Sequence, residues 1–273
     1  MALTIHRPQG ALADSIEMLW CYEGYHPAHP AERILPIGHM EIVISLTDVP
    51  FRLRYADGMT RHIAHALVSG GQSQPYLTDT SQSMTLLSVL FKPGAALPFF
   101  GTGGHELHNH HLSLEDLWGL AARDLYCRLL EAGTVQARFQ ILEQALCERL
   151  VRAKARHRAV GYALAAFRTA PGNVAVRQVA DDIALSHARF IQVFREDTGM
   201  TPKQYVRVQR FQRAMHMLAA NSSVEQTDVA LACGYYDQSH FINDFRKFAG
   251  ITPTEYAPWS RDHNANVPVF EKV

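Results

Sequence analysis

Hydrophobic positions follow different periods in the two halves of the chain. In the first hundred residues, apolar and β-branched runs of strand length occur at 40–46 and 84–91. Glycines punctuate this region, at Gly38, Gly58, Gly70, Gly71 and Gly94. Short strands at regular spacing predict a barrel or a sandwich. From about residue 113 to residue 256, apolar positions instead recur every three or four residues, which predicts helices.

The first predicted helices form a pair that follows the β-rich part. Ser113 and Asp116 suit the start of a helix that runs towards Leu130, and Gly133 separates it from a second helix over 135–154. A basic stretch at 152–158 marks the domain boundary. We therefore expect an α+β chain of two domains. A β-rich domain with its helix pair covers 1–152, an all-α domain covers 153–260, and a tail covers 261–273.

The all-α part contains an internal repeat of 51 residues. Residues 190–205 and 241–256 agree at eight of sixteen positions, where typical residue frequencies give about one agreement by chance. Each copy holds a Phe pair that forms a buried stripe, a Gly that suits a helix C-terminus, and a Thr-Pro that suits the next helix start. These residues are Phe190, Phe194, Gly199, Thr201 and Pro202, and then Phe241, Phe245, Gly250, Thr252 and Pro253.

A short helix and a tight turn precede each Phe pair, at 176–186 and 226–235. Ala180 and Ala230 stand where two helices would cross, and Gly234 suits the second turn. Helix, turn, helix in two copies predicts a duplicated helix-turn-helix, with units at about 160–200 and 203–257; one copy alone would equally suit an ordinary helical hairpin. A connecting helix over 202–219 would span about 27 Å, which suits two successive major grooves about 34 Å apart.

The face opposite each Phe pair carries short or planar polar side chains, which are the types that bond to base edges. Gln and Asn can form two hydrogen bonds to adenine, and Arg can bond guanine or phosphate. A solvated polar face is the alternative. The predicted DNA-contacting residues are Ala188, Arg189, Gln192 and Arg195 in the first copy and Gln238, Ser239, His240, Asn243 and Arg246 in the second.

The charge distribution changes this picture only modestly. The 273-residue chain is neutral overall, but residues 1–150 hold 10 basic and 15 acidic side chains, whereas residues 151–273 hold 16 and 11. A basic second half is what a polyanion-binding domain requires. No run reaches the roughly 18 apolar residues of a membrane span, and the first residues lack a leader pattern, so we expect a soluble cytoplasmic protein. The cysteines, expected to be buried reduced thiols, are Cys21, Cys127, Cys147 and Cys233.

Residues 160–258 resemble the AraC-type regulators. The family pattern is matched by Val229-Ala230, Gly234-Tyr235, Gln238-Ser239-His240-Phe241, Phe245-Arg246, Gly250, Thr252-Pro253 and Tyr256. The resemblance implies a sequence-specific DNA-binding transcription regulator that is not an enzyme and has no cofactor. By this resemblance, the residues at positions 188, 191 and 192 and at positions 238, 239, 240 and 243 face the bases. Ile191 therefore joins the predicted DNA-contacting residues. The sequence departs from the pattern at Ala184, where the first turn usually has Gly, and the apolar Ala188 and Ile191 suit thymine methyls.

The first 150 residues are similar to the acidic, β-rich sensor halves of some of these regulators, through segments 35–43 and 91–94. A cupin-like barrel would bind a small-molecule effector. The pocket candidates, each of which also suits core or rim, are Trp20, His39, Glu41 and Phe91. The expected partners are promoter DNA, RNA polymerase, the effector and, through helices at about 113–152, a second copy. The alternative for those helices is packing between the domains.

Three other functions were weighed against this interpretation. His105 and His108 could bind a metal in a hydrolytic enzyme, but they lack a third carboxylate ligand and suit a surface loop better. A methyl-acceptor DNA-repair protein shares this DNA-binding module, and it would need clustered thiolates in the N-terminal half. A sequence-tolerant architectural DNA binder is the remaining rival, and it would show no preferred DNA motif.

Overall fold

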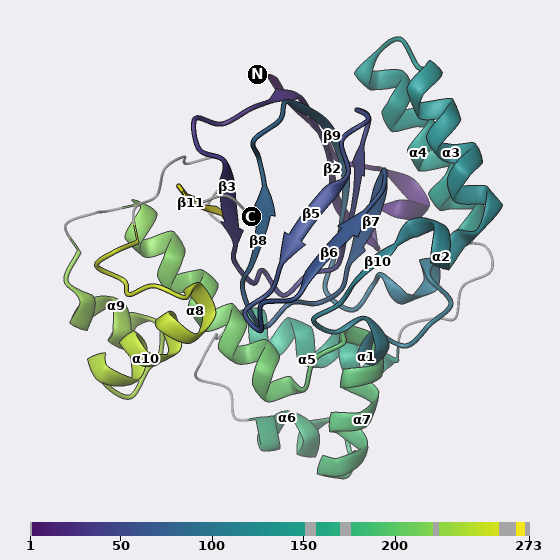
Figure 1. Ribbon diagram of the computed structural model, residues 1–273. Helices are drawn as coiled ribbons and strands as arrows, with labels where there is room; N and C mark the ends of the chain where they lie inside the picture. Colours follow the sequence, from purple (N-terminus) through teal and green to yellow (C-terminus); the bar gives the residue numbers. More distant parts are fainter. Residues whose placement is uncertain (1, 151–156, 170–175, 221–223, 257–265, 271–273) are drawn as a thin grey trace.

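A computed structural model describes residues 2–150, 157–169, 176–220, 224–256 and 266–270. Its N-terminal part consists of two antiparallel β-sheets, and its C-terminal part is helical (Figure 1), which confirms the predicted α+β chain. In spatial order, the first sheet contains β1 (Ala2–His6), β2 (Ile16–Tyr25), β9 (Met84–Phe91), β4 (Glu41–Ser45), β7 (Ala66–Ser69) and β10 (His111–Ser113). The second contains β11 (Asn266–Val269), β3 (Ala31–Ile34), β8 (Tyr76–Asp79), β5 (Phe51–Arg54) and β6 (Thr60–Ile63). Two short 3-10 helices, at Gly10–Leu12 and Leu97–Phe99, complete this part.

Side-chain alternation gives the first sheet two different faces. In β4, Ile42 and Ile44 belong to the hydrophobic core, whereas Glu41 and Val43 line an internal cavity. Successive side chains of a strand point to opposite faces, so the same division follows in the neighbouring strands β2 and β9. One face therefore packs on helices, and the other encloses the cavity together with the second sheet.

Three helices cover the core face of the first sheet: α2 (Leu114–Trp118), α3 (Leu120–Glu131) and α4 (Val135–Leu150). Buried leucines of α3 and α4 share one core with β4 and β9. The pair predicted over 113–154 is present, but its first helix is divided at Gly119, whose φ of 59° a helix does not permit. The predicted end at 154 and the domain boundary at 152/153 lie outside the described residues.

The C-terminal part contains two similar helix pairs joined by one long helix (Figure 1). The first pair is α6 (Val176–Asp182) and α7 (His187–Thr198), and the second is α9 (Gln226–Ala232) and α10 (Gln238–Ala249). The connecting helix α8 (Pro202–Ala220) has 19 residues, one more than predicted, and α5 (Arg158–Thr169) packs beside α7. No helix in the described part of the chain is long and apolar enough to cross a membrane.

The two parts of the molecule are in close contact. The short helix α1 (Gly104–Leu107) of the N-terminal part packs on α7, where a Cβ added to Gly104 would lie 2.6 Å from the backbone nitrogen of Gly199. Only glycine permits backbones to approach this closely. Leu35 and Val267 also belong to the hydrophobic core of the helical part. The β-rich and helical parts therefore share buried surface.

The C-terminal segment returns to the N-terminal sheet, which the sequence did not indicate. Strand β11 pairs antiparallel with β3, with Asn266 opposite Ile34 and Val269 opposite Ala31. The first residues of the predicted tail, 261–265, lie outside the described residues. The end of the described chain is thus part of the β-rich fold rather than a free extension.

Candidate nucleic-acid interface and internal cavity

The sequence repeat is reproduced as a repeat of aromatic contacts. The ring centroids of Phe190 and Phe194 are 5.7 Å apart, and those of Phe241 and Phe245 are also 5.7 Å apart. All four side chains are fully buried. Tyr205 packs at 5.6 Å from Phe194, and its counterpart in the second copy packs at 5.7 Å from Phe245. These edge-to-face contacts hold α7 and α10 in the same way, so the opposite faces of both helices point outwards.

The two turns between the helices also follow one pattern. In the first, the backbone N–H of Leu185 donates to the carbonyl of Ala180 at 3.2 Å, and in the second the equivalent bond to Ala230 is 2.9 Å. Ala184 has a φ of 54° and Gly234 a φ of 75°. Both turns therefore require one residue with a left-handed backbone conformation. In the first turn this residue is an alanine, whose Cβ makes the conformation less favourable than it would be for glycine.

Side chains cap the N-termini of α7 and α10. Ser186 Oγ accepts from the backbone N–H of Arg189 at 3.3 Å, and Asp237 Oδ1 accepts from that of His240 at 2.7 Å. Gly250 ends α10 in a left-handed conformation, as predicted. The Thr252-Pro253 pair was predicted to start another helix, but residues 253–255 form a turn.

The predicted DNA-contacting residues lie on one outward face of each recognition helix, as α7 and α10 are called from here on. All are exposed except Ile191, which is half-buried. On α7 these are Ala188, Arg189, Ile191, Gln192 and Arg195, and on α10 they are Gln238, Ser239, His240, Asn243 and Arg246. Most lie in the N-terminal half of their helix, which is the half that helix-turn-helix proteins place against base edges.

The two faces differ in how their polar groups are engaged. On α7, Arg189 Nη1 donates to Gln192 Oε1 at 2.9 Å, and Gln192 Nε2 donates to Glu196 Oε1 at 2.9 Å. On α10, Gln238 and Asn243 make no side-chain hydrogen bond to any described residue. The amides of α10 are thus free for an external partner, whereas the amide of α7 is held along its own helix.

A buried ion pair fixes only the second recognition helix to α8. Asp244 is 6% exposed and accepts from both Nε and Nη2 of Arg207, the former at 3.2 Å. The hydrogen bonds to Asp244 raise the pKa of Arg207. The position equivalent to Asp244 in α7 is Val193, which is buried and apolar. A charged clamp in one copy therefore replaces an apolar contact in the other.

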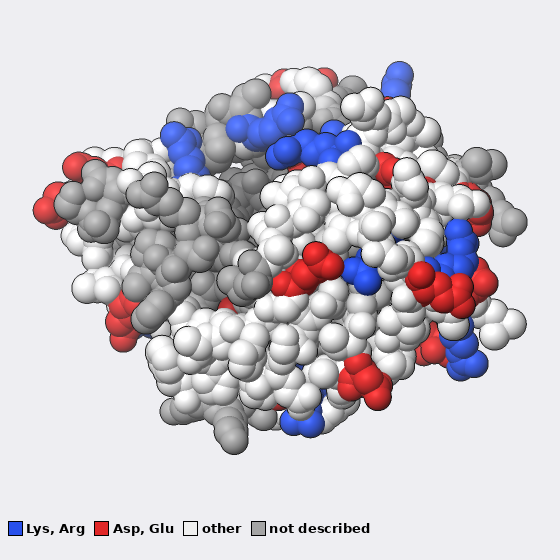
Figure 2. Space-filling model, turned by 90° about the horizontal axis from the view of Figure 1, so that it is seen from above, with Lys and Arg blue, Asp and Glu red and all other residues white. Residues whose placement is uncertain are grey.

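A groove of about 550 Å³ lies between the two units, lined by α6, α8 and α10. Of its basic residues, Arg207 is bound to Asp244 and Arg210 lies over the Tyr235 ring at 5.0 Å. Lys203 is exposed on its wall. Figure 2 shows the opposite end of the molecule from α6 and α7, where the described charged residues have both signs and wide uncharged areas separate them.

The N-terminal part encloses a cavity of about 420 Å³ between its two sheets. Trp20 and Glu41 lie on its wall, as the sequence predicted for a pocket. His39 and Phe91 do not line it, which corrects the prediction. Phe91 is fully buried in the core because it shares the inward face of β9 with Val89, and the cavity face carries Leu90. His39 instead bonds through Nδ1 to the carbonyl of Phe91 at 3.0 Å, and burial lowers its pKa.

Glu41 is a polar group of the cavity wall on strand β4. Its Oε1 accepts from Trp20 Nε1 at 3.1 Å and from Ser88 Oγ at 2.5 Å. Burial raises the pKa of Glu41, and these two hydrogen bonds oppose that rise. Burial, and then the charge of Glu41, raise the pKa of the neighbouring Tyr76. Glu41 thus stands beside two aromatic side chains, Trp20 and Tyr76, on the cavity wall.

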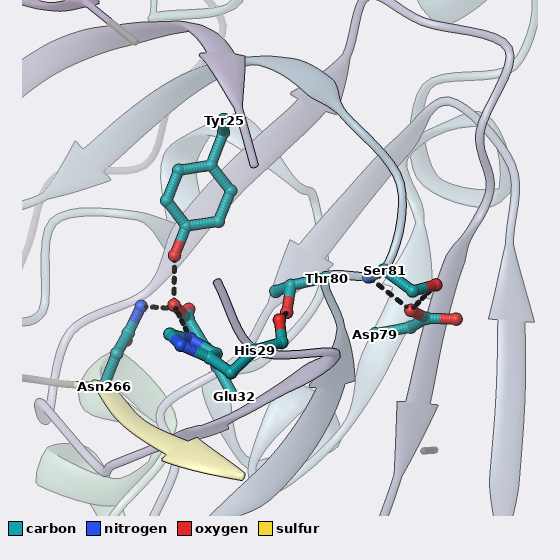
Figure 3. Close-up of polar contacts among 7 residues, drawn as sticks. All are labelled: Tyr25, His29, Glu32, Asp79, Thr80, Ser81 and Asn266. Carbon is teal, nitrogen blue, oxygen red and sulfur yellow. Dashed lines mark hydrogen bonds and ion pairs between the residues drawn. The ribbon is translucent and has the colours of Figure 1, made fainter. Parts of the chain in front are cut away.

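A second carboxylate, Glu32, joins the cavity wall to the C-terminal strand (Figure 3). Glu32 is 5% exposed and accepts from the hydroxyl of Tyr25, and His29 Nε2 lies 2.9 Å from its Oε1. Asn266 Nδ2 of β11 donates to its other oxygen at 2.7 Å. Burial and the adjacent Glu32 raise the pKa of Tyr25. Both oxygens of Glu32 are therefore already bonded to the protein.

Side chains that lie far along the sequence, after the N-terminal strands, complete the cavity. The sequence analysis did not predict them. Gln212 and His216 of α8 and Asn266 of β11 line it. Gln212 also donates from Nε2 to the Pro36 carbonyl at 2.6 Å. The sequence shows that Gln212 and His216 are one helical turn apart on the same helix face. It does not show that this face meets the N-terminal strands that line the cavity.

Two minor predictions have clear structural outcomes. His108 is bonded within the fold, through Nδ1 to the Gly71 carbonyl at 2.7 Å, and His105 lies on the short helix α1 rather than a loop. The four cysteines were all expected to be buried, but Cys127 and Cys147 are exposed because they lie on the outer faces of α3 and α4. Burial raises the pKa of the Cys21 thiol, which opposes thiolate formation.

Fold and surface together define a tandem helix-turn-helix domain joined to a β-rich domain with an internal cavity. Residues 179–258 match the family described as "Helix-turn-helix domain", and residues 4–113 match "Domain of unknown function (DUF6597)". The C-terminal part of the chain is therefore an AraC-type helix-turn-helix domain, and a β-rich domain precedes it.

Three individual proteins illustrate what the chain is similar to. The HTH-type transcriptional activator RhaS of Escherichia coli O9:H4 (strain HS) is 34% identical over 77 residues, which are 28% of this chain and 27% of that protein. The match thus spans about a quarter of the relative's length. ToxT from Vibrio cholerae O395, bound to (E)-4-(8-methylnaphthalen-1-yl)but-3-enoic acid, has the same fold with 9% identity and a TM-score of 0.50, over 87% of this chain and 97% of that one. A DNA-binding transcriptional dual regulator from Escherichia coli K-12 is 25% identical over 36% of this chain and 87% of its own, with a TM-score of 0.32.

Proposed function

We propose that this protein is a sequence-specific transcription regulator that binds promoter DNA through both recognition helices. The supporting observation is the pair of outward faces on α7 and α10, which a 51-residue repeat places in equivalent positions. Gln238, Asn243 and Arg246 are exposed there and offer the hydrogen-bond geometry that base edges require. The helix α8 spans about 28 Å, close to one turn of DNA.

The N-terminal cavity is proposed as the site of a small-molecule effector. The cavity wall includes Gln212 and His216 of α8, the helix that carries both units. A ligand that moves these side chains would move α8 directly, and α8 sets the distance between the two recognition helices. Such differential contact is what an effector needs in order to shift a conformational equilibrium.

On a promoter, the protein would activate transcription through RNA polymerase and catalyse no reaction itself. The relative RhaS is named as an activator. A homodimer through the helices at 113–152 is part of the proposal, supported by the exposed apolar side chains Leu120 and Leu130 of α3. The proposed location is the cytoplasm, because a bacterial protein that binds promoters must reach the chromosome there.

Selection of binding sites from random duplex DNA tests the proposal. The full chain should enrich a motif with a strong block of preferred bases under α10 and a weaker one under α7, where Ala188 and Ile191 suit thymine methyls. A chain with Gln238, Asn243 and Arg246 all changed to Ala is the matched control and should lose one block. Enrichment of no motif longer than a few base pairs would contradict specific recognition and favour an architectural DNA binder.

A further inference from the structure

The charged residues of the cavity wall all have one sign. The wall includes three carboxylates, Glu32, Glu41 and Asp79, and its described lining includes no lysine or arginine. Apart from the His216 imidazole, an anionic ligand would meet no basic side chain on this wall, and three carboxylates would oppose its entry in a medium of low dielectric constant. The sign of the wall favours a cation.

Among these three carboxylates, Glu41 is the one with an oxygen that has no partner among the described residues. Both oxygens of Glu32 are bonded, to Tyr25 and His29 on one side and to Asn266 on the other (Figure 3). Asp79 accepts from the backbone and hydroxyl of Ser81 and lies 3.5 Å from Arg52. The oxygens of Glu32 and Asp79 are therefore already engaged by side chains and backbone of the protein.

Glu41 differs from these two. Both of its hydrogen bonds, from Trp20 and Ser88, go to Oε1, and Oε2 has no partner among the described residues. Its side chain lies deep in the domain, on the cavity face of the central strand β4. A carboxylate oxygen on the cavity wall without a donor can accept from a ligand, and a ligand N–H group is the partner it lacks.

The rest of the wall specifies the body of the ligand. Trp20 and Tyr76 lie next to Glu41, and aromatic faces attract a cation in addition to its ion pair. The remainder is mostly aliphatic and includes Val43, Leu67 and Leu86. A polyol would leave hydroxyl groups unpaired against such a surface, so the cavity suits an apolar body with a single polar head.

We propose that the cavity binds a small organic amine, whose ammonium group bonds to Glu41 Oε2 between Trp20 and Tyr76 and whose apolar body lies between the sheets. The proposal names the ligand class of the effector site and rests on the proposed function for its biological role. The physical claim is separate: the cavity prefers a cationic head to a neutral or an anionic one.

Three probes of nearly equal size test the preference: 2-phenylethylamine, 2-phenylethanol and phenylacetate. The full chain is titrated with each by calorimetry, without DNA. The amine should bind at least about tenfold more tightly than the alcohol and the acid, because only the amine forms the charged hydrogen bond. Equal or tighter binding of the alcohol or the acid, or no binding by any probe, would overturn the proposal.

Variants assign the preference to one side chain. Glu41→Gln should lower amine affinity about tenfold and leave alcohol affinity unchanged, whereas Glu41→Asp should keep the amine preference. Glu23→Gln is the matched control, since Glu23 is an exposed carboxylate on the same strand as Trp20 and lies outside the cavity wall. An unchanged amine affinity in a folded Glu41→Gln chain contradicts the assignment. An amine that binds but leaves DNA affinity unaltered would uphold the ligand class and contradict only the effector role.

Discussion

The two helix-turn-helix units have one fold and two different surroundings. The first unit, α6 and α7, packs through Gly199 against Gly104 of the β-rich part, and its Gln192 is engaged by Arg189 and Glu196. The second unit, α9 and α10, leaves Asn243 free of described partners and is clamped to α8 by Asp244. Repetition therefore preserves the aromatic core and leaves the surfaces free to diverge.

This difference suggests a division of labour between the units. A recognition helix that is packed against the β-rich part, and whose amide is occupied, is suited to holding the protein on the DNA backbone. A recognition helix with free amides is suited to discriminating bases. The β-rich part touches both units at the ends of their recognition helices, through the backbone of α1 at Gly199 and through the side chain of Arg33 at Gly250.

The largest expected effect comes from breaking the clamp of the second unit. Asp244→Ala leaves Arg207 without its buried partner and should destabilise the helical part by about 2 kcal/mol, less than for a fully buried pair because Arg207 remains 28% exposed. Chemical denaturation of the full chain measures this. Asp228→Ala, which removes an exposed carboxylate of α9, should change stability by less than about 0.5 kcal/mol. Equal effects of the two variants would show that the clamp contributes nothing.

Removing one amide from each recognition helix tests the division of labour. Asn243→Ala should weaken binding to a selected site by about 2 kcal/mol and abolish the preference at one base pair. Gln192→Ala should weaken binding by about 1 kcal/mol or less and do so equally for matched and base-substituted sites. Affinities for a set of single-base variants of the site distinguish the two outcomes. The reverse pattern would assign base recognition to the first unit.

The two turns offer a reciprocal pair of substitutions. Ala184→Gly should stabilise the first unit by about 1 kcal/mol, because Ala184 holds a left-handed φ of 54° at an exposed position. Gly234→Ala should destabilise the second by a similar amount. Denaturation midpoints of the full chain report both changes. If Ala184→Gly lowers stability, the turn does not have the conformation described.

The smallest expected effect concerns the groove between the units. Lys203 is exposed on its wall, and its replacement by Ala should reduce the salt dependence of DNA affinity by about one counterion, without altering the preferred motif. Affinity measured over a series of salt concentrations gives the slope. An unchanged slope would place Lys203 away from the phosphates.

Much of the helical part was predictable because its signals are local. The Phe pairs, Gly199, Gly250 and the Thr-Pro pairs are separated by fixed short spacings, and these spacings alone determine which face of a helix is buried. Two copies made the pattern distinguishable from chance. In the β-rich part, strands β4 and β9 were found from their apolar runs. Alternate side chains of each strand face the cavity, but the sequence does not show which of the two alternating sets does so. The prediction therefore assigned Phe91 to the cavity, although it lies in the core.

The remaining part of the site depends on contacts between distant segments. Strand β11 is four residues long and contains Pro268, which argues against a central strand, and only its pairing with β3 at the sheet edge gives it a structure. Asn266, Gln212 and His216 reach the cavity through tertiary packing alone. Gly38 and Gly94 marked turns in the sequence, but both also lie where the two parts of the molecule meet.

The central claim is that both units dock on one face of DNA, and a hydroxyl-radical footprint of the full chain on its selected site tests this most directly. Two recognition helices joined by α8 should protect two stretches of backbone whose centres lie about one helical turn, roughly 10 base pairs, apart. The Asn243→Ala chain should lose protection mainly at one of them. A single protected stretch, or uniform protection without a repeat, would contradict a tandem helix-turn-helix regulator that uses both of its units.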